Sequence, residues 1–168
     1  MLKFKTGDLV YHPFYGTGII TSIQTLEVSG AEQLYYIVDL AIGDVLMIPI
    51  KEAEEAYLHS PMSTESIIAI LFATPMELAD DFRHRREHLE GKINSGNPES
   101  VCEALRDLAW RENTAHLSRG DRGLMVSAKK IVSNVLVRLP DRDIREASQL
   151  LESMLTRCAR EWEVSGLR

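Results

Sequence analysis

The chain has 168 residues, of which 45% are hydrophobic and 26% are charged, so it can form one globular domain or two small ones without metals or disulfides. Its net charge of −6 argues against nucleic-acid binding through overall charge, and no apolar stretch approaches the roughly 20 residues of a membrane span. The first ten residues include Lys3, Lys5 and Asp8 and lack the apolar core of a signal peptide, so we expect a cytoplasmic protein.

The first fifty residues predict four short strands. The segments 8–12, 18–24, 33–39 and 45–49 are rich in β-branched and aromatic residues, and turn residues separate them. Strands this short and closely spaced indicate a small, strongly bent barrel or sheet.

After about residue 60 the spacing of apolar residues becomes helical. Ser63–Ser66 is typical of a helix start, and Thr74–Glu77 forms a capping box that predicts a second helix running to about Ile93. A third helix is predicted from Asn97-Pro98, where asparagine can cap and proline suits the first turn.

A fourth helix is predicted from Leu117-Ser118 and a fifth from Pro140-Asp141. The change of pattern places a domain boundary near His59-Ser60-Pro61, so we expect one domain over residues 1–59 and another over residues 60–168. No repeat or low-complexity tract interrupts either part.

Charge is distributed unevenly between these parts. Residues 1–59 contain three lysines against eight acidic residues, whereas residues 83–130 contain ten basic residues against seven acidic ones. Such asymmetry indicates that the two parts have different partners.

An ordered set of short motifs resembles one protein family along nearly the whole chain. Segments Phe4–Gly18, Tyr35–Val38 and Met47–Ile50 resemble the RNA-polymerase-interacting domain that CarD/CdnL proteins share with transcription-repair coupling factors. The second half is similar to the CarD/CdnL helical domain, and the matching stretches are Phe82–Glu90, Ser95–Pro98, Leu105–Leu108 and Leu117–Asp121. Since both halves match in order, the chain resembles CarD/CdnL proteins more than a fragment of a coupling factor.

The resemblance implies an α+β protein with a Tudor-like bent β-barrel followed by an all-α helical domain. The barrel is expected to dock on the β subunit of bacterial RNA polymerase. The helical domain is expected to contact promoter DNA at the upstream edge of the bubble, where an aromatic wedge in the minor groove stabilises the open complex. The resemblance implies no cofactor, no metal and no catalysis, and we expect a monomer that reaches the nucleoid through polymerase and binds DNA weakly by itself.

Phe82 stands at the wedge position, where the family typically has tryptophan. Phenylalanine can still unstack a base step, although it lacks the indole N–H that could bond a base edge. The predicted contacts to DNA phosphates are basic side chains around it and in later helices, namely Arg83, Arg85, Arg86, Arg111, Arg119, Arg122, Lys129 and Lys130. Ser127 stands where the family has lysine, which removes one expected contact.

The predicted polymerase-binding residues lie on the strands of the first domain. They are Leu26, Val28, Tyr35, Ile37 and Met47. Family members often have basic residues at the positions of Leu26 and Met47, so docking here could instead add a strand at a sheet edge. Some of the five must face the core, because side chains alternate along a strand.

Each site residue also has a structural interpretation. Phe82 could pack on its own domain, and its arginine neighbours could form a solvated helix face with pairs such as Arg83–Glu87 and Arg86–Glu90. His84 and His88 have the spacing of two metal ligands, but no third ligand is evident and arginines flank them. The cysteines, Cys102 and Cys158, form no CxxC pair and are expected to be reduced, Cys102 as a core residue rather than a nucleophile.

The sequence is compatible with two classes of function and lacks the features of a third. The first is a polymerase-bound regulator of open promoter complexes, and the second is an adaptor whose helical half binds protein rather than DNA. The third, an enzyme, lacks a nucleophile–base pair, a metal set or a phosphate loop. The first two differ in whether one exposed face joins Phe82 to the basic residues Arg83, Arg85, Arg86, Arg122 and Lys129.

Overall fold

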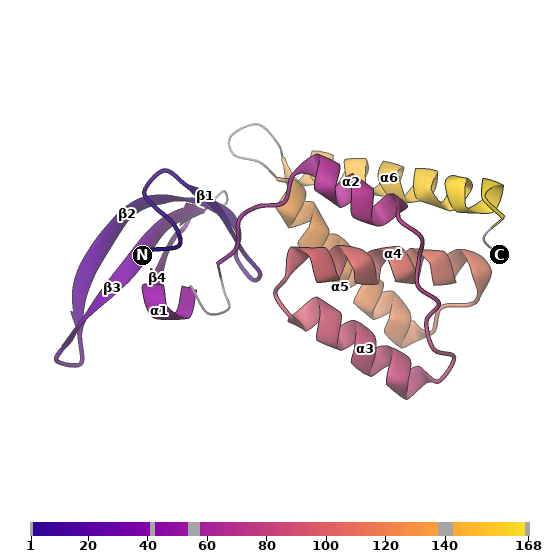
Figure 1. Cartoon of the computed structure of the whole chain (residues 1–168), viewed down its shortest axis with the longest axis horizontal. Helices are drawn as coiled ribbons and strands as arrows, with labels where there is room; N and C mark the ends of the chain where they lie inside the picture. The colour runs from indigo at the N-terminus through magenta and orange to yellow at the C-terminus, as the bar shows by residue number, and fades with distance from the viewer. Residues whose placement is uncertain (1, 41–42, 54–57, 138–142, 167–168) are drawn as a thin grey trace. The chain divides into compact units, whose positions relative to one another are not determined.

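The computed structural model describes residues 2–40, 43–53, 58–137 and 143–166 (Figure 1). The chain divides into two compact units at a boundary between Pro61 and Met62, a short distance after the expected position. An antiparallel sheet forms the first unit and helices form the second, which confirms the predicted α+β class with a bent, Tudor-like sheet preceding an all-α part.

The first unit is a four-stranded meander in the order β1-β2-β3-β4. Its elements are β1 (Leu9–His12), β2 (Gly16–Val28), β3 (Ala31–Leu40), β4 (Val45–Pro49) and the short helix α1 (Ile50–Glu52). All four predicted strands are present, but β2 and β3 are longer than predicted. The reason is that Ser29 and Gly30, with φ of 55° and 79°, form a two-residue turn that matches the strand twist and lets pairing continue to Val28 and Ala31.

A β-bulge bends the long hairpin of β2 and β3, whose curvature Figure 1 shows. The pairing register shifts between Ile20 and Ser22, which leaves Thr21 as the extra residue. Because side chains alternate along a strand, one extra residue changes which side chains of the following part of β2 face inward.

The core of the first unit lies on one face of the sheet. Tyr36, Val38 and Leu40 of β3 point into it. It also includes Phe4, Val10, Ile20, Ile48, Ile50, Ala53 and Leu58. The free edge of β1 is covered by His59, which exchanges backbone hydrogen bonds of 2.8 and 3.0 Å with Tyr11. No strand pairs with the outer edge of β4 in the part of the chain that the structure describes.

The second unit contains five helices, α2 (Thr64–Phe72), α3 (Phe82–Asn94), α4 (Pro98–Thr114), α5 (Arg119–Leu136) and α6 (Ile144–Val164). Helix α4 is central, since it packs against each of the other four. The side chains of Ser63, Asp81, Asn97 and Asp143 cap α2, α3, α4 and α6, each accepting a backbone N–H of the first turn. Among the described helices, none has the length and apolar character needed to cross a bilayer.

The predicted second helix is wrong in its first half. Residues 73–81 are extended, and helix α3 begins only at Phe82, behind the cap Asp81. The backbone N–H of Met76 donates to a carboxylate oxygen of Asp107 at 2.9 Å, which attaches the extended segment to α4. This tertiary hydrogen bond competes with the local helix that the Thr74–Glu77 capping box favoured.

The starts of the other helices agree with the prediction where they can be compared. Helix α2 begins behind Ser63, α4 behind Asn97 and α5 just after Ser118. The predicted start of the fifth helix, Pro140-Asp141, lies outside the described residues, and α6 begins at Ile144.

Gly18 should be sensitive to substitution because β2 approaches β3 closely there. A Cβ at Gly18 would lie 2.6 Å from Cγ1 of Val38 and 2.7 Å from the backbone oxygen of Asp39. Gly18→Ala is therefore expected to destabilise the sheet by about 1–3 kcal/mol, measured by urea titration of its NMR signals. Gly123→Ala is the control, since nothing lies within 4 Å of its added Cβ. An unchanged midpoint for Gly18→Ala would contradict this account of the close approach.

Candidate functional site

Phe82 lies where the N-terminal ends of α3 and α5 meet. It is the first residue of α3, and its side chain is 41% exposed. The guanidinium carbon of Arg85 lies 5.8 Å from the ring centroid. The ring edge faces Gly120 near the start of α5, where an added Cβ would lie 3.1 Å from Cε2 and Cζ of the ring. The ring is thus partly packed on its own domain and partly presented to solvent.

Arg85 was predicted to contact DNA, but it is buried and forms an ion pair with Asp121. Its Nε and Nη2 donate to the two carboxylate oxygens of Asp121 at 3.1 and 3.0 Å, and the residues are only 4% and 0% exposed. Its Nη1 donates to the backbone oxygens of Ala79 and Asp80 at 2.7 and 2.8 Å. Because its guanidinium is bound inside the unit, Arg85 is no longer a candidate for contacting DNA phosphates.

The electrostatics of Asp121 favour its charged form. Burial by itself raises the pKa of this carboxyl, but hydrogen bonds from Arg85 and Ser118 outweigh burial and lower the pKa below its ordinary value. The backbone N–H of Ser118 donates to Asp121 at 3.1 Å, and the backbone N–H of Asp121 donates to the Ser118 hydroxyl at 3.1 Å. This reciprocal pair is a capping box, so Asp121 ties the start of α5 to Arg85 of α3.

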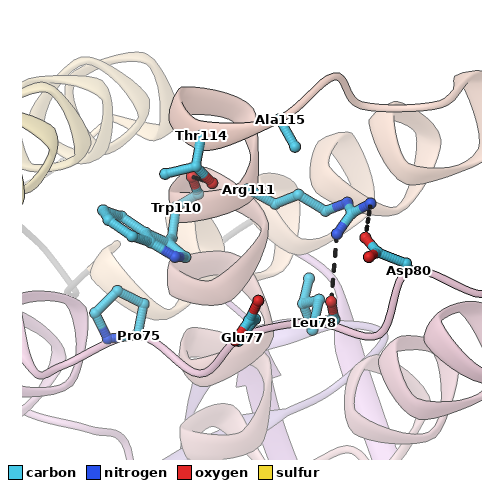
Figure 2. Close-up of a pocket in the computed structure, with 8 residues that line it drawn as sticks. All are labelled: Pro75, Glu77, Leu78, Asp80, Trp110, Arg111, Thr114 and Ala115. Carbon is cyan, nitrogen blue, oxygen red and sulfur yellow. Dashed lines mark hydrogen bonds and ion pairs between the residues drawn. The ribbon is translucent and has the colours of Figure 1, made fainter. Parts of the chain in front are cut away.

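Arg111 and Lys129 are also engaged within the second unit. Arg111 donates to the backbone oxygen of Leu78 and to the carboxylate of Asp80, both at 3.3 Å, as Figure 2 shows. It lines a cavity of about 420 Å³ between residues 75–80 and the end of α4. Lys129 pairs with Glu152 of α6 at 2.9 Å. Neither side chain extends the exposed surface around Phe82.

Four basic side chains are exposed and have no side-chain partner among the described residues. They are Arg83, Arg119, Arg122 and Lys130. Arg86 is exposed as well and bonds Glu90 at 2.7 Å, a surface pair of little energetic weight. The expected pair of Arg83 with Glu87 is not among the ion pairs of the described residues. We call Phe82 with Arg83, Arg86, Arg119, Arg122 and Lys130 the Phe82 surface.

Contact between Phe82 and Gly120 brings the two basic segments of this surface together. Arg83 follows Phe82 in α3, and Arg86 lies one turn further on the same side of that helix. Arg119 precedes Gly120 in α5, while Lys130 lies ten residues beyond Gly120, or about 15 Å along the helix. Arg83 and Arg86 are thus exposed on the helix that Phe82 begins, whereas Arg85 and Lys129 are engaged within the unit. That Arg122 shares a face with Phe82 stays a prediction.

A pattern in the sequence could have identified the burial of Arg85. It precedes Leu89 and Ile93 at intervals of four residues, and both of these are buried. Spacing of four residues puts all three on one helix stripe, so Arg85 occupies a core position that needs a carboxylate partner.

The histidine and cysteine side chains form no recognisable reactive site. His84 contacts the carboxylate of Asp81 at 3.2 Å, and no three metal-ligating side chains cluster anywhere in the described ranges. Cys102 and Cys158 are buried free thiols, and burial raises the pKa of Cys102 to about 12 and that of Cys158 to about 11. A thiol in this state is a poor nucleophile, which agrees with a packing role.

The five predicted polymerase-binding residues all lie on the sheet face opposite the core. Tyr35 and Ile37 alternate with the core residues of β3, and Ile37 pairs with Met47 of β4. The register after the bulge places Leu26 opposite Gln33 and Val28 opposite Ala31, on this same face. We call this the outer sheet face.

The outer sheet face is apolar and partly exposed. Val28 and Met47 are 47% and 49% exposed, whereas Ile37 is covered by its neighbours. Val45 was not predicted, yet it is 61% exposed and lies on the same face, two residues before Met47. The same face also carries Ser22, Gln24, Gln33 and Asp39, so polar side chains lie among its exposed apolar ones.

Comparison with protein families agrees with both halves of this arrangement. Residues 4–60 match the family model described as the CarD-like/TRCF RID domain, and residues 66–152 match that described as the CarD C-terminal domain. The chain belongs to the CarD family. CarD-like domains imply a transcription regulator that interacts with RNA polymerase, and the CarD family is not a known enzyme family.

Removing the charge of Asp121 should strongly destabilise the helical unit of this CarD-family protein. In Asp121→Asn the buried Arg85 keeps its charge without a counter-charge, which costs on the order of 3–5 kcal/mol. Asp80→Asn is the matched control, because the Asp80 side chain is 99% exposed in its pair with Arg111 and should contribute less than about 1 kcal/mol. Urea unfolding followed by tryptophan fluorescence measures both.

The pH dependence tests the same pair. The lowered pKa of Asp121 means that its contribution to stability is present above the ordinary value of 3.8 and is lost as pH falls through the lower folded-state value. The difference in unfolding free energy between wild type and Asp121→Asn should therefore shrink below about pH 4. A difference that stays constant to pH 2 would contradict the assignment.

Proposed function

We propose that this CarD-family protein contacts promoter DNA at the upstream edge of the transcription bubble and stabilises the open complex. The observation that carries the proposal is the Phe82 surface, in which a ring 41% exposed precedes the exposed Arg83 on α3 and contacts α5 at Gly120, next to the exposed Arg119, in a protein whose net charge is −6. Exposed aromatic and basic side chains together suit a groove contact, because arginines bind phosphates while the ring unstacks a base step.

The basic residues of the Phe82 surface would contribute to the affinity for DNA but not to recognition of a particular DNA sequence. Arg83, Arg119, Arg122 and Lys130 have no partner to give up within the described residues, and Arg86 can exchange its surface pair for a phosphate. With so few contacts, DNA binding by the free protein is weak and decreases with salt. Binding to polymerase would then bring the protein to promoters in the nucleoid, and the proposal takes the protein to be a monomer.

The outer sheet face would dock on the β subunit of the polymerase. That face is shared by Leu26, Val28, Tyr35, Ile37 and Met47, and Val45 extends it along β4, whose outer edge pairs with no strand of the described residues. Main-chain pairing at that edge could add to the contact, as in strand addition. Because Leu26 and Met47 are apolar where the family often has basic residues, docking here relies on apolar burial and should depend little on salt.

An adaptor that binds polymerase but not DNA is the second candidate function. It is favoured by the acidic total and by the engagement of Arg85, Arg111 and Lys129 in pairs within the helical unit. Both functions predict polymerase binding, so the two are separated by contact with DNA and by its effect on the open complex.

Open-complex lifetime under competitor challenge, with a matching bacterial polymerase, tests the proposal directly. Wild type should lengthen the lifetime, and Phe82→Ala should remove the effect while polymerase binding stays intact, a loss of roughly fivefold or more for one stacking side chain. Phe82→Trp should maintain or strengthen the effect. An unchanged lifetime with wild-type protein, together with confirmed polymerase binding, would favour the adaptor.

Docking through the outer sheet face predicts a different outcome for Met47. Met47→Asp places a charge among apolar contacts and should weaken polymerase binding at least tenfold, since burying an unpaired charge is costly. Val164→Asp is the control, because Val164 is also exposed, at 88%, but ends α6 in the other unit. Pull-down or fluorescence anisotropy with polymerase measures both, and equal affinity of the two variants would contradict this docking face.

A further inference from the structure

Gly120 is the residue of α5 that faces the Phe82 ring. A Cβ added at Gly120 would lie 3.1 Å from both Cε2 and Cζ of the ring, closer than such atoms normally approach. The backbone does not require glycine there, since Gly120 is absent from the residues with positive φ and lies in the first turn of a helix. The feature that a larger residue at this position would have to displace is therefore the ring itself.

Gly123, three residues along the same helix, shows what is specific about Gly120. It is also exposed and helical, yet nothing lies within 4 Å of an added Cβ. Both glycines weaken the helix relative to alanine. Only at Gly120 does the structure show a contact that explains the glycine.

Arg85 supports the same ring from another direction. Its guanidinium carbon lies 5.8 Å from the ring centroid, within the range of a cation–π contact. The guanidinium cannot turn away freely, because Asp121 and the backbone oxygens of Ala79 and Asp80 bind all three of its nitrogens. Phe82 thus lies between the backbone of α5 and a fixed cation, with the remaining ring surface exposed.

We propose that Gly120 and Arg85 are positioning residues that hold the Phe82 ring in the orientation in which it meets DNA. The inference rests on the proposed role of Phe82 in the open complex. Its physical basis is preorganisation, since a side chain already fixed in its bound orientation loses less conformational entropy on binding. The pair would thereby let phenylalanine act where the family typically has the larger indole.

The test compares Gly120→Ala with Gly123→Ala in the open-complex lifetime assay. Gly120→Ala requires the ring to shift by a few tenths of an ångström and should shorten the lifetime about 2- to 10-fold, the range for a side chain held off its preferred rotamer. Gly123→Ala should leave the lifetime unchanged. Thermal unfolding should show that neither variant loses stability, because alanine favours a helix more than glycine does.

A double-mutant cycle shows whether the effect passes through Phe82. In the Phe82→Ala background, adding Gly120→Ala should change nothing further. In the single variant, aromatic ¹H–¹³C NMR signals of Phe82 should shift, whereas Gly123→Ala should leave them in place. These readouts would not respond to a general structural role of Gly120.

The possible outcomes separate the inference from the function beneath it. If Phe82→Ala shortens the lifetime but Gly120→Ala leaves it unchanged or lengthens it, Gly120 does not position the ring and the inference is wrong. The inference also fails if Gly120→Ala has the same effect with and without Phe82. If Phe82→Ala itself has no effect, the proposed function fails and the inference fails with it.

Discussion

The ion pair between Arg85 and Asp121 connects the three segments that meet beside Phe82. Arg85 belongs to α3, Asp121 belongs to the first turn of α5, and the same guanidinium bonds the backbone at Ala79 and Asp80 just before α3. A charge buried this deeply must keep its partner, because an unpaired guanidinium inside the unit would cost several kcal/mol. The junction therefore forms as one arrangement, and Phe82 takes its place within it.

The extended segment 73–81 depends on further polar contacts from α4. Asp107 accepts the N–H of Met76. Arg111 donates to the oxygen of Leu78 and to Asp80, as Figure 2 shows. These bonds satisfy backbone groups that a helix would otherwise have satisfied internally. Arg111 is engaged in this way, and Arg85 and Lys129 are engaged in ion pairs, so counting basic residues along the sequence overstates the number available to a partner.

The two units present surfaces of different character. The outer sheet face is apolar and belongs to an acidic unit, whereas the Phe82 surface is basic with a half-exposed ring. Such a division suits one partner bound by apolar burial and another bound by phosphate contacts. The bulge at Thr21 helps to form the outer sheet face, because the changed register puts Leu26 and Val28 on the same face as Ile37 and Met47.

Local rules of the sequence were enough to predict the fold class, the four strands and most helix starts. Capping residues such as Ser63 and Asn97 and the alternation around Tyr36 act over a few residues, so they can be recognised without the structure. The resemblance to the family singled out Phe82 as the wedge position. The strand pattern, together with the resemblance, singled out the five candidate residues of the outer sheet face. Their shared outer face depended on the register.

The tertiary structure alone decided what depends on partners distant in sequence. Asp121 is 36 residues from Arg85 and converts an apparent surface arginine into a core one, while Asp107 replaces the predicted first turn at Thr74 with an extended segment. The reason for a glycine at position 120 is visible only in the structure, where the ring of Phe82 lies beside it. Sequence patterns report on a residue's neighbours along the chain, whereas burial and ion pairing are set by neighbours in space, and these arise only when the helices pack.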